Sequence, residues 1–196
     1  MPSRALLFLV LATLPGVLSA HADHAVTADL GGSFLAGLLH PVLGLDHVLA
    51  MVAVGLWGAF LGRPAIWLLP VVFPLVMAFG GALGIVGVPL PGVEVGIALS
   101  AVALGLAIAF ALRPPLAVAG VLVGAFAVFH GHAHGTELPE AAAPIAYAAG
   151  FLFATGVLHA LGILFGVLVR WPAGAIAVRA GGGAISLAGA WFLLAA

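Results

Sequence analysis

The sequence predicts an all-α membrane protein: a signal peptide followed by six transmembrane helices, the first of them kinked or broken near Pro41 and Gly44. The chain is 65% hydrophobic and only 6% charged, whereas soluble domains are about 25% charged. It contains six apolar segments long enough to cross a bilayer. The breaks between these segments carry glycine, proline and arginine, the usual punctuation of helical membrane proteins.

The first 20 residues have the pattern of a cleavable secretory signal peptide. Arg4 gives the positive start, residues 5–14 form a short apolar core, and cleavage is expected after Ala20 or Ala22. An uncleaved first membrane helix is the alternative, and the shortness of the apolar run argues against it. The rest of the chain, residues 21–196, is then one six-helix transmembrane domain.

The mature chain would begin with the polar stretch His21-Ala-Asp-His24. A free α-amine beside either histidine could act as an additional metal ligand. The alternative is a disordered tail, which is common at termini.

The six spans are expected at residues 31–61, 65–88, 93–112, 115–131, 143–169 and 174–195. Export of the N-terminus places loops one, three and five in the cytoplasm, and these loops carry Arg63, Arg113 and Arg170. The only charged residues of loops two and four are acidic: Glu94, Glu137 and Glu140. The positive-inside rule therefore agrees with the signal peptide and predicts a multi-pass protein with both mature termini in the periplasm.

The first span contains His40, Asp46 and His47 within an apolar segment. An Asp there costs roughly 2.5–3.5 kcal/mol on insertion scales, and such groups usually mark an ion or proton pathway. In a straight helix the two histidines would lie roughly 10 Å apart, too far to share one ion with bonds of about 2 Å. Either the helix is broken between them or they are successive stations, and Pro41 and Gly44 favour a break.

A second cluster, His130, His134 and Glu137, has the spacing i, i+4, i+7 of one helical face, and an i, i+4 histidine pair is a chelating arrangement. His132 would point elsewhere, and a histidine-rich exposed loop is its simplest interpretation.

Counting about 1.5 Å per residue from the cytoplasmic ends, His47 and His130 lie at similar depth, towards the periplasmic face. His159 falls near the middle of the bilayer, where it is either a relay on the path or a histidine that merely hydrogen-bonds a carbonyl. Met51 lies four residues after His47 and offers a thioether ligand, although packing is the more common role of such a methionine.

The stretch His40-Pro41-x-x-Gly44-x-Asp46-His47 is similar to the His-x5-Asp-His signature of the HupE/UreJ family. The stretch Phe129-His130-Gly131-x-Ala133-His134-Gly135-x-Glu137 resembles the second signature of that family. Such proteins are described as nickel or cobalt permeases of the bacterial inner membrane, linked to hydrogenase or urease maturation. The resemblance implies that the metal is bound or passed on by His40, Asp46, His47, His130, His134 and Glu137. His132 occupies a variable position of the signature.

We therefore expect a permease that moves a divalent transition-metal cation from periplasm to cytoplasm, nickel first and cobalt second, with no permanently bound cofactor and no enzymatic activity. Imidazole and carboxylate ligands also suit zinc and copper. The formal net charge of −1 offers no basic patch for nucleic acid, and the absence of cysteine removes thiolate ligands.

Two alternatives remain open. One is an intramembrane zinc-dependent hydrolase, in which Ser100 is the only plausible serine nucleophile, although it lacks a Gly-x-Ser-x-Gly elbow. The other is a metal-binding accessory or sensor protein without transport.

Overall fold

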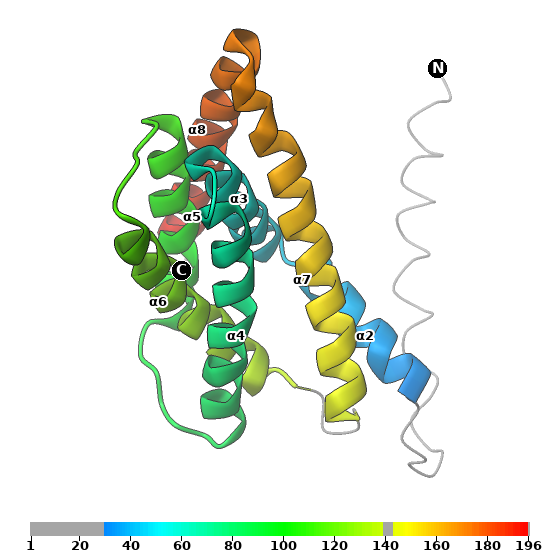
Figure 1. Ribbon diagram of the computed structural model, residues 1–196. Coiled ribbons are helices and arrows are strands. Elements are labelled where there is room, and N and C mark those ends of the chain that lie inside the picture. The colour runs from blue at the N-terminus through cyan, green and yellow to red at the C-terminus, as the bar shows by residue number, and fades with distance from the viewer. Residues whose placement is uncertain (1–29, 139–142, 196) are drawn as a thin grey trace, which may run out of the picture.

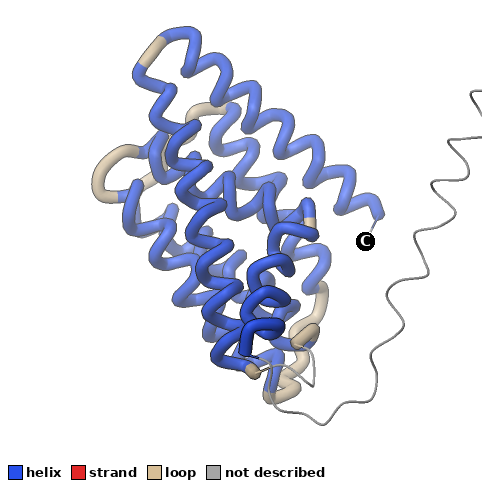
Figure 2. The backbone as a smooth tube through the Cα atoms, turned by 90° about the vertical axis from the view of Figure 1, so that its right-hand side faces the viewer, coloured by secondary structure: helices blue, strands red, loops and turns tan. Residues whose placement is uncertain are grey.

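The computed structural model describes residues 30–138 and 143–195, in which all regular structure is helical (Figures 1 and 2). The predicted signal peptide, His21 and His24 lie outside these residues. The elements in chain order are α2 (Leu30–Leu43), α3 (Leu45–Leu61), α4 (Ala65–Ile85), α5 (Val93–Ala109), α6 (Leu116–Thr136), α7 (Pro144–Gly166), the 3-10 turn η1 (Val167–Arg170) and α8 (Pro172–Ala195).

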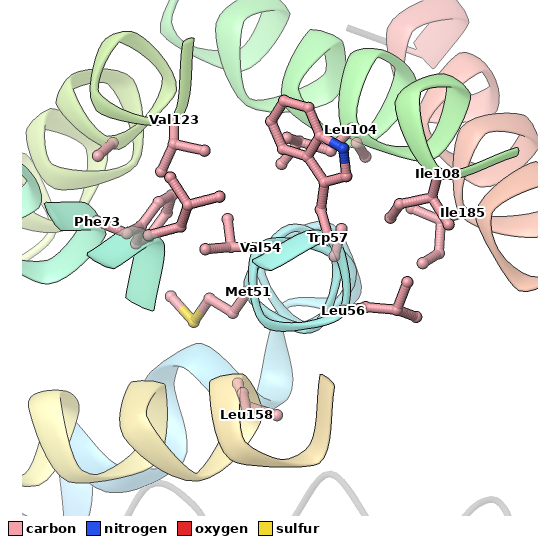
Figure 3. Close-up of a cluster of buried hydrophobic side chains, with 14 of the residues drawn as sticks. Met51, Val54, Leu56, Trp57, Phe73, Leu104, Ile108, Val123, Leu158 and Ile185 are labelled. Atoms are coloured by element: carbon pink, nitrogen blue, oxygen red, sulfur yellow. The ribbon is translucent and has the colours of Figure 1, made fainter. Parts of the chain in front are cut away.

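Helix α3 is the centre of the bundle. Its side chains are buried in an almost unbroken run from Ala50 to Phe60. Figure 3 shows α3 end on, with large side chains directed outwards to the surrounding helices. Met51, Val54 and Trp57 are at most 1% exposed and belong to the same apolar cluster as residues of α4, α5, α6, α7 and α8. A helix that is apolar all round is expected at such a central position.

Helices α2 and α3 together form the first predicted span, and they meet at a bend of 82°. The predicted break is confirmed, and its position is Gly44, where the backbone is extended between the two helices. Helix α2 continues through Pro41 to Leu43 before it ends. Because of the bend, His40 and His47 do not lie on one straight helix, the geometry that would hold them roughly 10 Å apart along its axis.

Glycines allow the main helix pairs to approach closely. A Cβ at Gly131 of α6 would overlap the carbonyl of Met77 on α4, and a Cβ at Gly162 of α7 would overlap the carbonyl of Val52 on α3. Small residues at such positions let backbones pack in lipid, where the hydrophobic effect does not hold helices together. The α4–α6 pair formed in this way supports the second histidine cluster.

The described residues contain four helices long and apolar enough to span a membrane: Ala65–Ile85, Leu116–Thr136, Pro144–Arg170 and Pro172–Ala195. The bent α2–α3 pair makes a fifth if it is counted as one span. Helix α5, which occupies the predicted span 93–112, ends at Ala109 and has only 17 residues. Length and composition therefore support four or five spans where six are predicted. Large apolar side chains such as Val121, Leu187 and Trp191 are over 70% exposed, as expected of a lipid-facing surface.

Arginines gather at one end of the bundle. The Arg113 guanidinium lies 4.8 Å from the centre of the Phe60 ring, near the end of α3. Arg179 donates from Nε to the carbonyl of Ala109 at 2.8 Å, which places the start of α8 beside the end of α5. The acidic residues of the described chain lie at the opposite ends of these helices: Asp46 in the first turn of α3, Glu94 in the first turn of α5, and Glu137 at the end of α6.

Candidate metal site

The two sequence motifs converge where α2 ends, α3 begins and α6 ends. Two groups of side chains can be distinguished, and we call them the outer and the inner group. The outer group consists of His40, His134 and Glu137, and the inner group consists of His47, His130 and His134.

The outer group offers one ligand atom from each residue, and these three atoms all lie within 4.8 Å of one another. His40 Nε2 is 3.2 Å from Glu137 Oε2. The rings of His40 and His134 meet edge to face with their centres 4.9 Å apart. Two imidazoles and a carboxylate at this separation are a ligand set typical of divalent transition metals.

The inner group contains three imidazole rings. The centre of the His47 ring is 5.0 Å from that of His130 and 4.5 Å from that of His134. His134 therefore belongs to both groups. The bend at Gly44 and the i, i+4 spacing on α6 together produce this arrangement.

Burial increases from the outer to the inner group. The side chain of Glu137 is 54% exposed and that of His40 is 29% exposed, whereas His134 is 7% and His130 is 0% exposed. The Glu137 carboxylate is therefore the most accessible of these side chains, and the imidazoles of His134 and His130 are the least accessible.

Asp46 orients His47. Its Oδ1 accepts hydrogen bonds from the His47 backbone N–H at 2.9 Å and lies 2.8 Å from His47 Nδ1. Because an ionised carboxylate only accepts, the proton of the neutral ring is on Nδ1 and the lone pair is on Nε2. A Cβ at Gly44 would lie 3.1 Å from both Asp46 Oδ1 and His47 Nδ1, so glycine leaves room for this pair.

Several imidazole nitrogens of the inner group are buried without a hydrogen-bond partner among residues 30–138 and 143–195. They are His47 Nε2, His130 Nδ1, His134 Nδ1 and His134 Nε2. Buried polar atoms are almost always satisfied, and each exception needs an explanation. These unsatisfied imidazole nitrogens lie on rings that contact one another, and a cation is one partner that could satisfy them; of the two groups, only the outer one has three ligand atoms within 4.8 Å of one another.

A cavity of about 310 Å³ opens beside the site. Its lining includes Asp46, His47, Glu137 and also Glu94, from the first turn of α5. Glu94 is placed in the second loop by the sequence analysis but is not among the predicted ligands. Its only sequence signal is that it is an acidic residue on the side where an entering cation is expected.

His159 lies deeper than the inner group. The centre of the Phe73 ring is 5.5 Å from that of the His130 ring and 5.5 Å from that of the His159 ring, so Phe73 contacts both histidines. The His159 ring lies near the Pro70 carbonyl. That carbonyl is available because Pro74, four residues on, has no N–H to donate to it.

The remaining weaker candidates lie outside both groups. Met51 is fully buried in the apolar core, as the packing interpretation predicts. His132 is on α6 but turned away from the site, with Nε2 2.7 Å from the Val88 carbonyl in the α4–α5 connection. It is 7% exposed, so the exposed-loop interpretation of His132 is wrong. Helix α6 continues to Thr136 and buries it.

The sequence alone indicates no role for Ser100 other than that of a nucleophile. In the structure Ser100 Oγ donates to the Ile97 carbonyl at 2.6 Å and lies 3.0 Å from His130 Nε2. The hydrogen bond therefore connects α5 to the inner group.

The fold and the site define a class: a multi-pass helical membrane protein with buried imidazoles next to more exposed carboxylates. The chain belongs to the HupE/UreJ family, whose model, "HupE / UreJ protein", matches residues 9–192. A relative from Rhizobium leguminosarum bv. viciae, "Protein HupE", is 48% identical over 181 residues, which cover 92% of each chain. No solved structure shows a significant match to the chain.

Proposed function

We propose that this protein is an inner-membrane permease that carries a divalent transition-metal cation, nickel first and cobalt second, from the periplasm to the cytoplasm. The observation that supports this most strongly is the convergence of both motifs on a set of buried imidazole nitrogens that lack partners within the described part of the chain. The association of the family with nickel and cobalt points to the same cargo. The metal would supply hydrogenase or urease maturation.

In the proposed pathway, Glu137 and Glu94 attract the hydrated cation into the cavity. The outer group replaces part of its water, and His134, which is shared, passes it to the inner group. Conduction requires binding that is weak enough or distributed enough for the ion to leave. A shared ligand between two adjacent sites meets that requirement, because one bond is kept while the others exchange.

The path would continue past Phe73 towards His159. An inward-negative membrane potential favours cation entry by about 2.3 kcal/mol per charge for each 100 mV. That energy is available without any nucleotide.

The test is uptake into sealed proteoliposomes that contain a metal indicator, with nickel, cobalt, zinc, copper and magnesium compared. Asp46→Asn keeps the size and an acceptor oxygen but removes the charge, and His47→Ala removes a ligand of the inner group. We expect both variants to fold and to lose nickel uptake. Ser186→Ala is the control, because Ser186 is buried on α8, a helix that contributes no residue to either group, and should not affect uptake.

Uptake that is retained in both variants would contradict the proposal. Metal binding without uptake would favour the accessory or sensor alternative, and metal-dependent cleavage of a lipid or peptide would favour the hydrolase. The orientation of the Ser100 hydrogen bonds gives the hydrolase no support. The Ser100 proton goes to the Ile97 carbonyl and not to His130, opposite to an activated nucleophile.

A further inference from the structure

Ser100 and His130 form a buried pair between two helices. Both residues are 0% exposed, Ser100 on α5 and His130 on α6. The pair depends on a close approach of these helices one turn earlier, where a Cβ at Gly96 would collide with the ring of Phe129. The contact is therefore part of the packing of the bundle.

The protons of this pair can be assigned. A serine hydroxyl has one proton, and Ser100 Oγ lies 2.6 Å from the Ile97 carbonyl, which can only accept. The remaining lone pairs of Oγ face His130 Nε2 at 3.0 Å, so Nε2 must be the donor. A neutral imidazole has one N–H, and its lone pair is then on Nδ1.

The Nδ1 atom of His130 is the one that has no partner within residues 30–138 and 143–195. The ring to which it belongs meets the His47 ring edge to face at 5.0 Å. Ser100 thus engages Nε2 and leaves Nδ1 as the nitrogen of this ring that is available for a ligand.

We propose that Ser100 is a positioning residue that fixes the tautomer of His130, so that Nδ1 and not Nε2 is offered to the metal. This proposal rests on the proposed function as a metal permease. Asp46 has the complementary effect on His47, whose Nδ1–H it accepts and whose Nε2 it leaves free. Two rings of the inner group thus have their lone pairs set before an ion arrives. Groups that hold the second nitrogen of a ligating histidine commonly tune metal affinity by about 10–100-fold.

The first test reads the tautomer directly, in the full-length protein without metal. Histidine labelled with ¹⁵N is observed by solid-state NMR in lipid bilayers, and the His130 signals are identified by their loss in His130→Gln. We expect a protonated Nε2 and an unprotonated Nδ1 in the wild type. A proton on Nδ1 in the wild type would overturn the proposal.

The variants separate positioning from packing. In Ser100→Ala the Nε2–H loses its acceptor, so an Nδ1–H population should appear, whereas Ser100→Thr keeps the hydroxyl and should keep the wild-type tautomer. Ser186→Ala removes a buried serine hydroxyl elsewhere and should change nothing at His130. An unchanged tautomer in Ser100→Ala would overturn the proposal.

Nickel affinity, measured by titration in nanodiscs, gives the functional result. We expect Ser100→Ala to weaken it by about 10–100-fold, with Ser100→Thr close to the wild type. Unchanged affinity in Ser100→Ala would also overturn the proposal. If the wild type binds nickel but transports none, the permease function fails while the tautomer assignment is still tested by the spectra.

Discussion

His134 is the residue on which both ligand groups depend. Its ring centre lies 4.9 Å from that of His40 and 4.5 Å from that of His47. Neither of its nitrogens has a hydrogen-bond partner in the part of the chain that the structure describes. An ion held by the outer group could therefore reach the inner group without leaving this side chain.

We expect His134→Ala to reduce the rate of nickel uptake by about tenfold or more, equivalent to at least about 1.4 kcal/mol in the activation free energy of uptake. The matched control is His132→Gln on the same helix. Glutamine can still donate to the Val88 carbonyl, which is the only hydrogen bond of the His132 side chain in the described residues. The rate of nickel uptake into proteoliposomes is measured for both variants. A normal rate in His134→Ala would show that the two groups are not successive stations.

The sequence predicts which side chains come together in the outer and inner groups, and their role as metal ligands stays a prediction; it does not predict the residues that support them. The i, i+4, i+7 spacing identifies the face of α6, because helical periodicity relates sequence to position directly. Glu94 and Ser100 have no such local signal. Their roles depend on how closely α5 approaches α6, which is set by a glycine meeting a distant phenylalanine. Such pair contacts cannot be derived from one sequence.

At the scale of elements, the break between α2 and α3 is the feature that creates the site. Pro41 and Gly44, close to Asp46, predict a break in the helix, but they do not predict the direction of the bend. The bend of 82° is determined by the helices against which α2 and α3 pack, above all α7. Gly150 and Gly162 of α7 each lie against one of the two helices, at the carbonyls of Phe34 and Val52.

Gly162→Ala should therefore destabilise the protein, since its Cβ would overlap the Val52 carbonyl and push α3 away from α7. Overpacking of this kind typically costs about 1–3 kcal/mol. Gly156→Ala is the control on the same helix, because nothing lies within 4 Å of its added Cβ, and we expect it to be neutral or slightly stabilising, by up to about 1 kcal/mol. The free energy of unfolding of each variant is measured by circular dichroism during titration with SDS. Equal stability of the two variants would argue against a tight α3–α7 contact.

At the scale of the whole molecule, charge is separated along the bundle. The cavity beside the ligand groups is lined by Asp46, Glu94 and Glu137, while Arg113 and Arg179 contact the opposite ends of α3 and α5. By the positive-inside rule we expect the arginine end to lie in the cytoplasm. The cavity would then open to the periplasm, as uptake requires.

The natural absence of cysteine makes this orientation directly testable, because each introduced thiol is the only one in the chain. Pro91→Cys places a thiol in the exposed connection between α4 and α5, near the acidic end, and Trp171→Cys places one after η1, where the side chain is 60% exposed. In right-side-out spheroplasts, a membrane-impermeant maleimide should label the first variant at once and the second only after permeabilisation. Both variants must retain nickel uptake for the comparison to hold. The reverse labelling pattern would place the cavity in the cytoplasm, and the same ligand groups would then have to collect metal from the inside, so that export, and not uptake, would be the direction favoured by the structure.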